Sequence, residues 1–172
     1  NAGVIDPDSF KGYVAVGGYS ALIQALSEMT PADVLEEITA SGLRGRGGAG
    51  FPAGVKWGFL NPQEGEQIYL VINADESEPG TFKDRVIMEN DPFSVIEGMA
   101  IAAYAIGAAT AYIYLRAEYR YLLKGLEQAL SQARDKGFLD ARVTVSEFPD
   151  SARVNSVRLV FNVNPGEKVK IR

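Results

Sequence analysis

The chain has 172 residues, 47% of them hydrophobic, and a formal net charge of −5, which suits one domain with its own core. The acidic balance argues against nucleic acid as a partner, because phosphate backbones bind surfaces with a surplus of Lys and Arg. The sequence contains no Cys and no His, so disulfides, an iron–sulfur cluster and imidazole acid–base chemistry are not expected from this chain.

Helices are predicted for the first part of the chain. Residues 17–29 carry apolar side chains at helical spacing, and Thr30 followed by Pro31 is a typical start for a second helix. A glycine-rich loop follows, and a short third helix is expected over residues 53–60. Residues 1–40 are therefore predicted to form a helical lead-in.

Two predicted strands alternate with two helices in the middle of the chain. The run IYLVI, residues 68–72, is wholly apolar between turn formers, which is typical of a strand covered on both faces. A helix from Pro92, a strand at 110–116 and an amphipathic helix ending before Gly137 follow. This alternation favours right-handed crossovers onto a parallel sheet. We therefore predict an α/β fold of three layers, with a mostly parallel sheet and Rossmann-like crossovers.

The tail, residues 138–172, is predicted to be rich in β-structure. Its strands are expected at residues 142–148 and 154–163, and the turn NPGE then leads into a last strand of a hairpin. The chain shows no internal repeat and no low-complexity segment. We therefore expect residues 1–172 to form a single domain.

The stretch SGLRGRGGAGFPAGVKW, residues 41–57, is the most unusual part of the chain. Its Gly45, Gly47 and Gly50 satisfy the pattern GxGxxG, but a dinucleotide fingerprint needs a preceding strand, and a helix is predicted here instead. We therefore do not expect a Rossmann nucleotide site. What remains is a backbone without Cβ atoms, whose successive amides can line a concave anion site.

Positive charge surrounds these amides, because Arg44, Arg46 and Lys56 lie in or beside the loop. Bare amides and local positive charge suit an anionic small ligand, such as a phosphate group, even in an acidic protein. The alternative interpretation is a flexible surface turn.

Acidic and amide side chains follow the first predicted strand, at the edge of a parallel sheet where ligands tend to bind. They are Asn73, Asp75, Glu76 and Glu78. Carboxylates repel phosphate but accept hydrogen bonds from sugar hydroxyls, ring N–H groups or a carboxamide, so the loop and the strand end together suit the two ends of a nucleotide. Two alternatives stay open: solvated acids in a turn, and a divalent cation bound by Asp75, Glu76 and Glu78.

Two aromatic side chains, Phe51 and Phe59, bracket Lys56 after the glycines. Aromatic rings in such positions can stack on a planar ligand ring. Packing in the core is the alternative for Phe59.

Three long motifs resemble a known family: GLRGRGGAGFPAGVKW, NADESEPGTFKDR and EGMAIAAYAIGAATAYIYLRAEY. They are similar to the flavin-binding subunit through which NADH enters respiratory complex I. They are also similar to diaphorase subunits of NAD-reducing or bifurcating hydrogenases and of NAD-dependent formate dehydrogenases. The likeness covers roughly residues 14–137. It implies a flavoprotein that accepts hydride from NADH onto FMN and passes electrons to an iron–sulfur partner.

The resemblance also implies roles for individual residues. FMN would be held by Gly45, Arg46, Gly47, Gly48 and Lys56. The ribityl chain or the ring side of the flavin would meet Asn73, Asp75 and Glu76. The NADH side would be Phe51 and Phe59 on the adenine, with Glu78 at nucleotide hydroxyl or amide groups.

The sequence departs from the family pattern after Gly137. The family continues into a segment like GAGAYICGEE, which completes the flavin and nicotinamide site, and RVTVSEF followed by PDSARVNS stands here instead. In the tail, VNSV is faintly similar to the family's VNNVE, which makes Asn155 a further FMN candidate. Two other functions stay open: a structural paralogue with an incomplete or absent flavin site, and a phosphate-binding module without redox chemistry.

Partners and location also follow from the resemblance. The partners would be iron–sulfur protein subunits of a multi-subunit redox complex. Because no apolar run reaches about 18 residues, we expect no direct membrane insertion. The expected location is the cytoplasm, including the periphery of a membrane complex.

Overall fold

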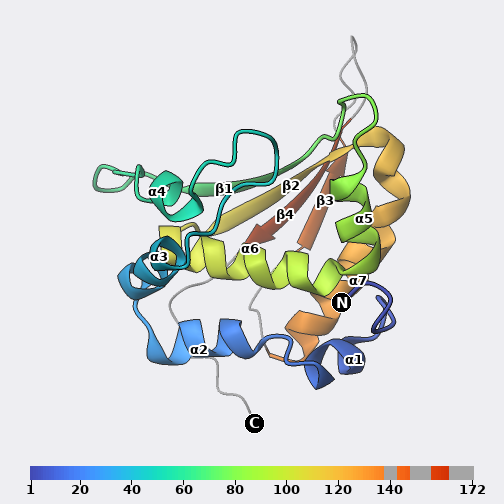
Figure 1. Cartoon of the computed structure of the whole chain (residues 1–172), viewed down its shortest axis with the longest axis horizontal. Helices are drawn as coiled ribbons and strands as arrows, with labels where there is room; N and C mark the ends of the chain where they lie inside the picture. The colour runs from blue at the N-terminus through green and yellow to red at the C-terminus, as the bar shows by residue number, and fades with distance from the viewer. Residues whose placement is uncertain (138–142, 148–155, 163–172) are drawn as a thin grey trace.

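The computed structural model describes residues 1–137, 143–147 and 156–162 (Figure 1). The first helices are α1 (Phe10–Ala15), α2 (Ser20–Glu28), α3 (Pro31–Ala40) and α4 (Ala53–Trp57). The middle of the chain forms β1 (Tyr69–Ala74), α5 (Lys83–Asn90), α6 (Pro92–Ile106) and β2 (Thr110–Arg116). The last elements are the 3-10 helix η1 (Ala117–Leu122), α7 (Leu123–Asp135), β3 (Val143–Glu147) and β4 (Ser156–Asn162).

Helix boundaries follow local signals. At the start of α3 the Thr30 hydroxyl accepts a hydrogen bond from the Asp33 amide (3.3 Å), while the Asp33 carboxylate accepts one from the Thr30 amide (2.8 Å). This capping box satisfies two amides that the helix itself leaves unpaired. Helix α6 ends at Ile106, and the next residue, Gly107, has a φ of 71°, a left-handed conformation that favours glycine. The helices predicted in the first part of the chain are confirmed, with α4 shorter than expected.

The strands form one mixed sheet in the order β1-β2-β4-β3. Strands β1 and β2 are parallel, whereas β4 is antiparallel to both β2 and β3. The α/β class is confirmed, but the prediction of a mostly parallel sheet is wrong for the described strands. For β3 and β4 the reason is the length of the chain between them, residues 148–155, because a parallel pair needs a crossover of about a dozen residues or more.

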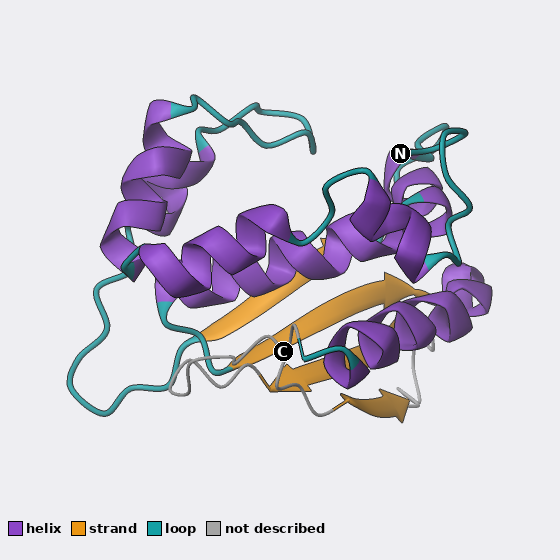
Figure 2. Ribbon diagram, turned by 90° about the horizontal axis from the view of Figure 1, so that it is seen from below, coloured by secondary structure: helices purple, strands orange, loops and turns teal. Residues whose placement is uncertain are grey.

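The helices stack on one face of the sheet (Figure 2). Helix α6 packs on β1 and β2, α7 packs beside α6, and α2 and α3 pack against α6 from the N-terminal part of the chain. The order is therefore sheet, helix, helix rather than helices on either face. On the other face of β1, Tyr69 and Val71 are 49% and 57% exposed. The expectation that this strand is covered on both faces is wrong, because an apolar run does not reveal which face is buried.

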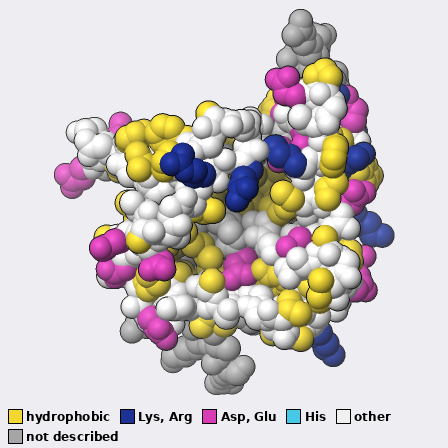
Figure 3. All heavy atoms as spheres, in the orientation of Figure 1, with side chains coloured by type: hydrophobic (Ala, Val, Ile, Leu, Met, Phe, Trp, Pro, Cys, Tyr) yellow, Lys and Arg dark blue, Asp and Glu magenta, His cyan; other side chains and the backbone are white. Residues whose placement is uncertain are grey.

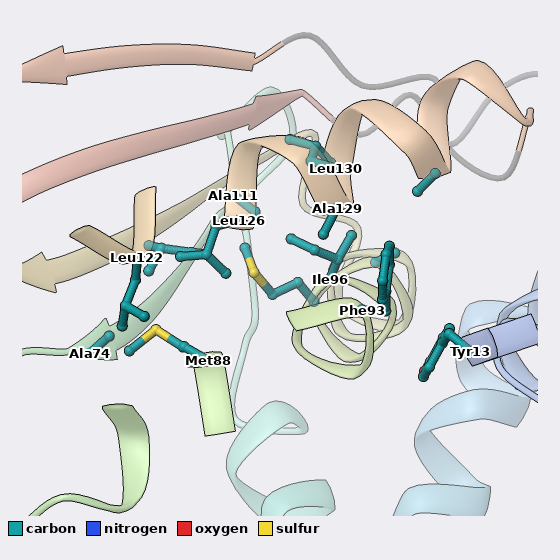
Figure 4. Close-up of a cluster of buried hydrophobic side chains, with 14 of the residues drawn as sticks. Tyr13, Ala74, Met88, Phe93, Ile96, Ala111, Leu122, Leu126, Ala129 and Leu130 are labelled. Atoms are coloured by element: carbon teal, nitrogen blue, oxygen red, sulfur yellow. The ribbon is translucent and has the colours of Figure 1, made fainter. Parts of the chain in front are cut away.

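The core lies between α6 and its neighbours (Figure 4). Phe93 and Ile96 of α6 pack with Leu126 and Leu130 of α7, and all four are 1% exposed. Burying one such side chain stabilises a fold by about 1.5–3 kcal/mol. Helix α6 is thus the central element of the core, and α3, α5 and β1 pack against it. No helix in the described ranges is long and apolar enough to cross a membrane.

One carboxylate is built into this core. Glu97 of α6, 8% exposed, accepts hydrogen bonds from the Tyr13 hydroxyl and from the amides of Tyr19 (2.8 Å) and Leu22 (3.2 Å). The two amides stand at the start of α2, where a helix leaves donors unpaired. Burial and the hydrogen bond to Glu97 raise the pKa of Tyr13 above its ordinary range, so this phenol stays a donor. Glu97 therefore attaches α1 and α2 to α6.

Candidate functional site

The glycine loop forms a narrow hairpin between α3 and α4. The Gly45 amide donates to the Phe51 carbonyl (2.9 Å), and the Ala53 amide donates to the Leu43 carbonyl (2.8 Å). The Arg44 guanidinium spans the loop and donates to the Gly50 carbonyl (2.9 Å). These bonds close the neck of the loop and leave its tip to the solvent. The Arg44 side chain therefore stabilises the loop by a hydrogen bond within it.

The two helices that flank the loop pack on each other, and Gly54 is the reason they can. A Cβ on Gly54 would stand 2.2 Å from Thr39 Oγ1 and 2.7 Å from Thr39 Cα. Only glycine allows α4 to approach α3 this closely. The presence of α3 directly before the glycines confirms that GxGxxG is not part of a Rossmann fingerprint here.

The tip of the loop is open on its glycine faces. A Cβ on Gly47, Gly48 or Gly50 would meet no atom within 4 Å. Gly48 has a φ of 139°, a backbone conformation that side chains disfavour. In the described part of the chain, no main-chain amide from residue 46 to residue 50 donates a hydrogen bond. Side chains do not fill the tip, so its amides remain free to bind an anion.

Basic side chains accompany this tip. Arg46 and Lys56 are exposed, and neither forms an ion pair or a side-chain hydrogen bond with the described residues. In Figure 3, Lys and Arg side chains gather in the upper half of the face shown, where the glycine loop runs. Charges without protein partners suit the binding of an anion.

The acidic segment begins where β1 ends. Asn73, Asp75 and Glu78 are exposed, and their bonds are local: the Asn73 side-chain oxygen accepts from the Asp75 amide (3.0 Å), and Asp75 accepts from the Ser77 hydroxyl (2.9 Å). The parallel register of β1 with β2 places Ala74 opposite Leu115. The three exposed side chains therefore lie at the carboxyl end of the parallel pair, where ligands of such sheets bind.

Glu76 differs from these neighbours because it is buried, with 5% exposure. Its carboxylate accepts hydrogen bonds from the amides of Asp84 (3.0 Å) and Arg85 (3.3 Å) and from the Tyr119 hydroxyl (3.3 Å). The Arg116 guanidinium donates to the Glu76 carbonyl (2.7 Å). We call these four groups the Glu76 clamp. The Glu76 carboxylate, which was predicted to face the flavin, therefore accepts hydrogen bonds from groups of the chain itself.

Sequence reasoning missed the other members of the clamp. The end of the motif NADESEPGTFKDR folds back onto its own glutamate, with Lys83 Nζ 3.8 Å from the Glu76 carboxylate. Arg116 and Tyr119 come from a motif some forty residues later. The available signal was the place of Arg116 at the end of β2, with Tyr119 three residues later in η1, beside the strand that ends at Ala74.

The pKa of Glu76 lies below its ordinary value. Burial raises this pKa, but the hydrogen bonds from the two amides and Tyr119, together with the charge of Lys83, more than offset that effect. A carboxyl group whose pKa is lower in the folded chain adds stability that is fully present above the unfolded pKa, near 4.5. That stability is lost as the pH falls through the folded value.

The variant Glu76→Gln is expected to lower the free energy of unfolding by about 2 kcal/mol at pH 7, because it weakens hydrogen bonds to a buried charge. At pH 3 the loss should be smaller, because below the unfolded pKa, near 4.5, the ionised Glu76 no longer adds its full stability to the folded chain. Urea unfolding at both pH values measures the difference. Glu78→Gln, at an exposed position of the same segment, should change the free energy by less than about 0.5 kcal/mol. Equal losses for Glu76→Gln at the two pH values would contradict this account.

The rings of Phe51 and Phe59, which come just before and just after α4, lie close to each other. The ring centres of Phe51 and Phe59 are 5.9 Å apart with an interplanar angle of 57°. Phe59 is 69% exposed, so packing in the core is wrong as its explanation. Phe59 also lines an open cavity of about 570 Å³ together with Leu60, Pro62 and Tyr69. Exposed rings beside an open cavity offer a surface for stacking.

Two further candidates remain, the divalent cation site and Asn155. In the described ranges, no group of three or more Asp, Glu, His or Cys residues could hold a metal ion. The Glu76 carboxylate is directed to the amides of α5 and not toward a position shared with Asp75 and Glu78. Asn155 lies outside the described residues.

Comparison with known proteins identifies relatives of this chain. The sequence model of the Nuo51 FMN-binding domain matches residues 38–166. An NADH-quinone oxidoreductase subunit of Rhizobium meliloti is 51% identical over 148 residues, which are 86% of this chain and 35% of that protein. The NADP-reducing hydrogenase subunit HndC of Solidesulfovibrio fructosivorans is 49% identical over 148 residues, 86% of this chain and 30% of that protein.

The chain is also similar to a solved structure. A crystal structure of an NAD⁺-reducing NiFe hydrogenase in the H2-reduced state superimposes with a TM-score of 0.63 and 42% identity. The superposition covers 72% of this chain and 21% of that chain. The chain thus spans about a third or less of the length of these relatives. Because the family match extends over most of its residues, the chain belongs to the family of the Nuo51 FMN-binding domain.

Proposed function

We propose that this chain binds FMN between the glycine loop and the carboxyl end of β1, accepts hydride from NADH onto that flavin and passes the electrons to an iron–sulfur partner. The observation that carries the proposal is the loop tip, where the amides are unbonded and the glycine faces are open. Arg46 belongs to this loop, and Lys56 lies on α4, the helix that follows it. Bound FMN would supply the hydride chemistry and the stepwise release of electrons, so no side-chain acid or base is needed.

The loop would hold the phosphate end of FMN. The amides of Gly47 and Gly48 can donate to phosphate oxygens, and Lys56 and Arg46 can neutralise their charge. Each charge-assisted contact of this kind contributes about 1.5–3 kcal/mol. Gly45 would border the phosphate through its backbone without a Cβ, because its amide already donates to the Phe51 carbonyl. The unfilled space over the glycines supports close approach of the phosphate to the backbone.

The acidic segment would meet the other end of the flavin. Asn73 and Asp75 can accept hydrogen bonds from ribityl hydroxyls or from the ring, and their exposure at the end of β1 supports this role. Glu76 would contribute by fixing the position of this segment, because its carboxylate is held by the clamp. Asn155 stays a prediction.

NADH would bind on the aromatic side of the loop. Phe51 and Phe59 would stack on the adenine, and the cavity beside Phe59 supports room for a planar ring. Glu78 would accept hydrogen bonds from nucleotide hydroxyl or amide groups. Fixing the two nucleotides in one orientation is the contribution that the protein makes to the rate.

Partners and location extend the proposal. The two relatives are named as subunits, one of an NADH-quinone oxidoreductase and the other of an NADP-reducing hydrogenase. We infer that this chain acts with iron–sulfur protein subunits in a redox complex in the cytoplasm, including the periphery of a membrane complex. It would act as one domain over residues 1–172.

A structural paralogue without flavin is the second candidate. It is favoured by the tail, where RVTVSEF stands in place of a family segment such as GAGAYICGEE. That segment forms part of the nucleotide site in the family that the chain resembles. For the same reason we expect FMN to bind more weakly than in the longer relatives.

FMN titration into the purified chain tests the proposal. Quenching of flavin fluorescence should be saturable, and an equal concentration of inorganic phosphate should not displace the flavin. NADH added without oxygen should then bleach the bound flavin. A chain that shows no quenching but remains folded supports the structural paralogue. Displacement by phosphate at the FMN concentration supports a phosphate-binding module.

A further inference from the structure

We propose that Arg116 and Tyr119 are positioning residues for the nucleotide: they hold Glu76 in place and thereby set Asp75 and Glu78 at the carboxyl end of β1. Neither residue needs to touch the ligand. The inference rests on the proposed function, since the segment that they hold is the one assigned to the flavin and to NADH.

Arg116 reaches the segment from the neighbouring strand. It is the last residue of β2, and the pairing of Leu115 with Ala74 brings it level with Asp75. One arm of its guanidinium donates to the Glu76 carbonyl (2.7 Å), and the other donates to the Glu118 carboxylate (2.7 Å). A forked guanidinium can fix two acceptors at once, which an ammonium group cannot do in the same geometry. Arg116 therefore fixes the main chain of the acidic segment.

Tyr119 holds the side chain of the same glutamate. Its hydroxyl donates to the Glu76 carboxylate (3.3 Å), and the guanidinium carbons of Arg85 and Arg116 each lie 6.0 Å from the centre of its ring. Arginines at this distance are attracted to the ring face. The ring of Tyr119 thus ties α5, β2 and Glu76 together.

Among the described residues, the partners of the residues next to Glu76 are local. Asp75 and Glu78 are exposed, and the bonds of the segment beyond Glu76 join near neighbours, such as the Thr81 amide to the Glu78 carbonyl (3.1 Å). Because Glu76 is held at both its carbonyl and its carboxylate, it limits where these two residues can lie. A segment ordered before binding loses less conformational entropy when the ligand arrives.

The test compares three variants of the full chain with the unmodified chain. Arg116→Gln removes the bond to the Glu76 carbonyl, and Tyr119→Phe removes only the hydroxyl. Glu118→Gln is the matched control, because it alters the exposed partner of the same guanidinium and leaves the bond to Glu76 intact. FMN affinity is measured by fluorescence quenching at a temperature at which circular dichroism shows every variant folded. Amide hydrogen exchange of residues 75–85 is measured without FMN.

Arg116→Gln is expected to weaken FMN binding about tenfold and Tyr119→Phe about threefold, with Glu118→Gln within about twofold of the unmodified chain. Exchange of the amides of residues 75–85 should rise in the first two variants and not in the control. Arg116→Lys should restore only part of the affinity. Unchanged FMN affinity in Arg116→Gln and Tyr119→Phe, with or without faster exchange, overturns the inference. An unmodified chain that takes up no FMN overturns the proposed function instead.

Discussion

Replacing Gly47 with valine is expected to abolish FMN binding while leaving the fold intact. The Cβ of residue 47 would meet no protein atom within 4 Å, and its backbone does not adopt the left-handed region, so the chain can accept a branched side chain. The same side chain would occupy the space through which a phosphate approaches the loop amides. We expect the affinity for FMN to fall at least about 100-fold, equivalent to about 2.7 kcal/mol. Fluorescence titration measures this loss.

The control for this variant is Gly125→Val. Position 125 lies in α7, away from the loop, and a Cβ there also meets no atom within 4 Å. Both variants should melt within about 3 °C of the unmodified chain, since neither fills space that the protein uses. Gly125→Val should bind FMN normally. Normal binding by Gly47→Val would remove the loop amides from the proposed site.

Local signals explain why much of the fold could be predicted. The start of α3 was readable because Thr30, Pro31 and Asp33 act within one turn of each other. The glycine loop could be predicted because a cluster of residues without Cβ atoms is visible in the sequence itself. Such features depend on residues that are close in sequence, where spacing alone determines geometry.

Features that depend on distant residues could not be predicted in the same way. Asp75, Glu76 and Glu78 look alike in the sequence, and only the arrival of α5 and of Tyr119 decides that the middle one turns inward. The open face of β1 is a similar case, because Tyr69 and Val71 are as apolar as residues that are buried. In both cases the missing information is which element packs nearby.

Replacing Gly54 with alanine is expected to disrupt the fold around the loop. The new Cβ would stand 2.7 Å from Thr39 Cα and 2.8 Å from Thr39 N, both backbone atoms of α3. Alanine favours a helix over glycine by about 1 kcal/mol, but relief of this overlap requires α4 to move away from α3. We expect a net loss of about 2–3 kcal/mol in the free energy of unfolding. FMN affinity should also fall where the variant remains folded, because α4 carries Lys56.

Two further variants separate this backbone contact from other effects of Gly54→Ala. Gly58→Ala adds a methyl group whose nearest atoms are 3.4 and 3.5 Å away, ordinary distances, so its free energy of unfolding should change by less than about 1 kcal/mol. Adding Thr39→Ala to Gly54→Ala removes Oγ1 but leaves the Cα and N of residue 39 in place. The double variant should therefore stay as unstable as Gly54→Ala in urea unfolding. Recovery of stability in the double variant would show that only the Thr39 side chain obstructs the methyl group, and that α4 does not have to move.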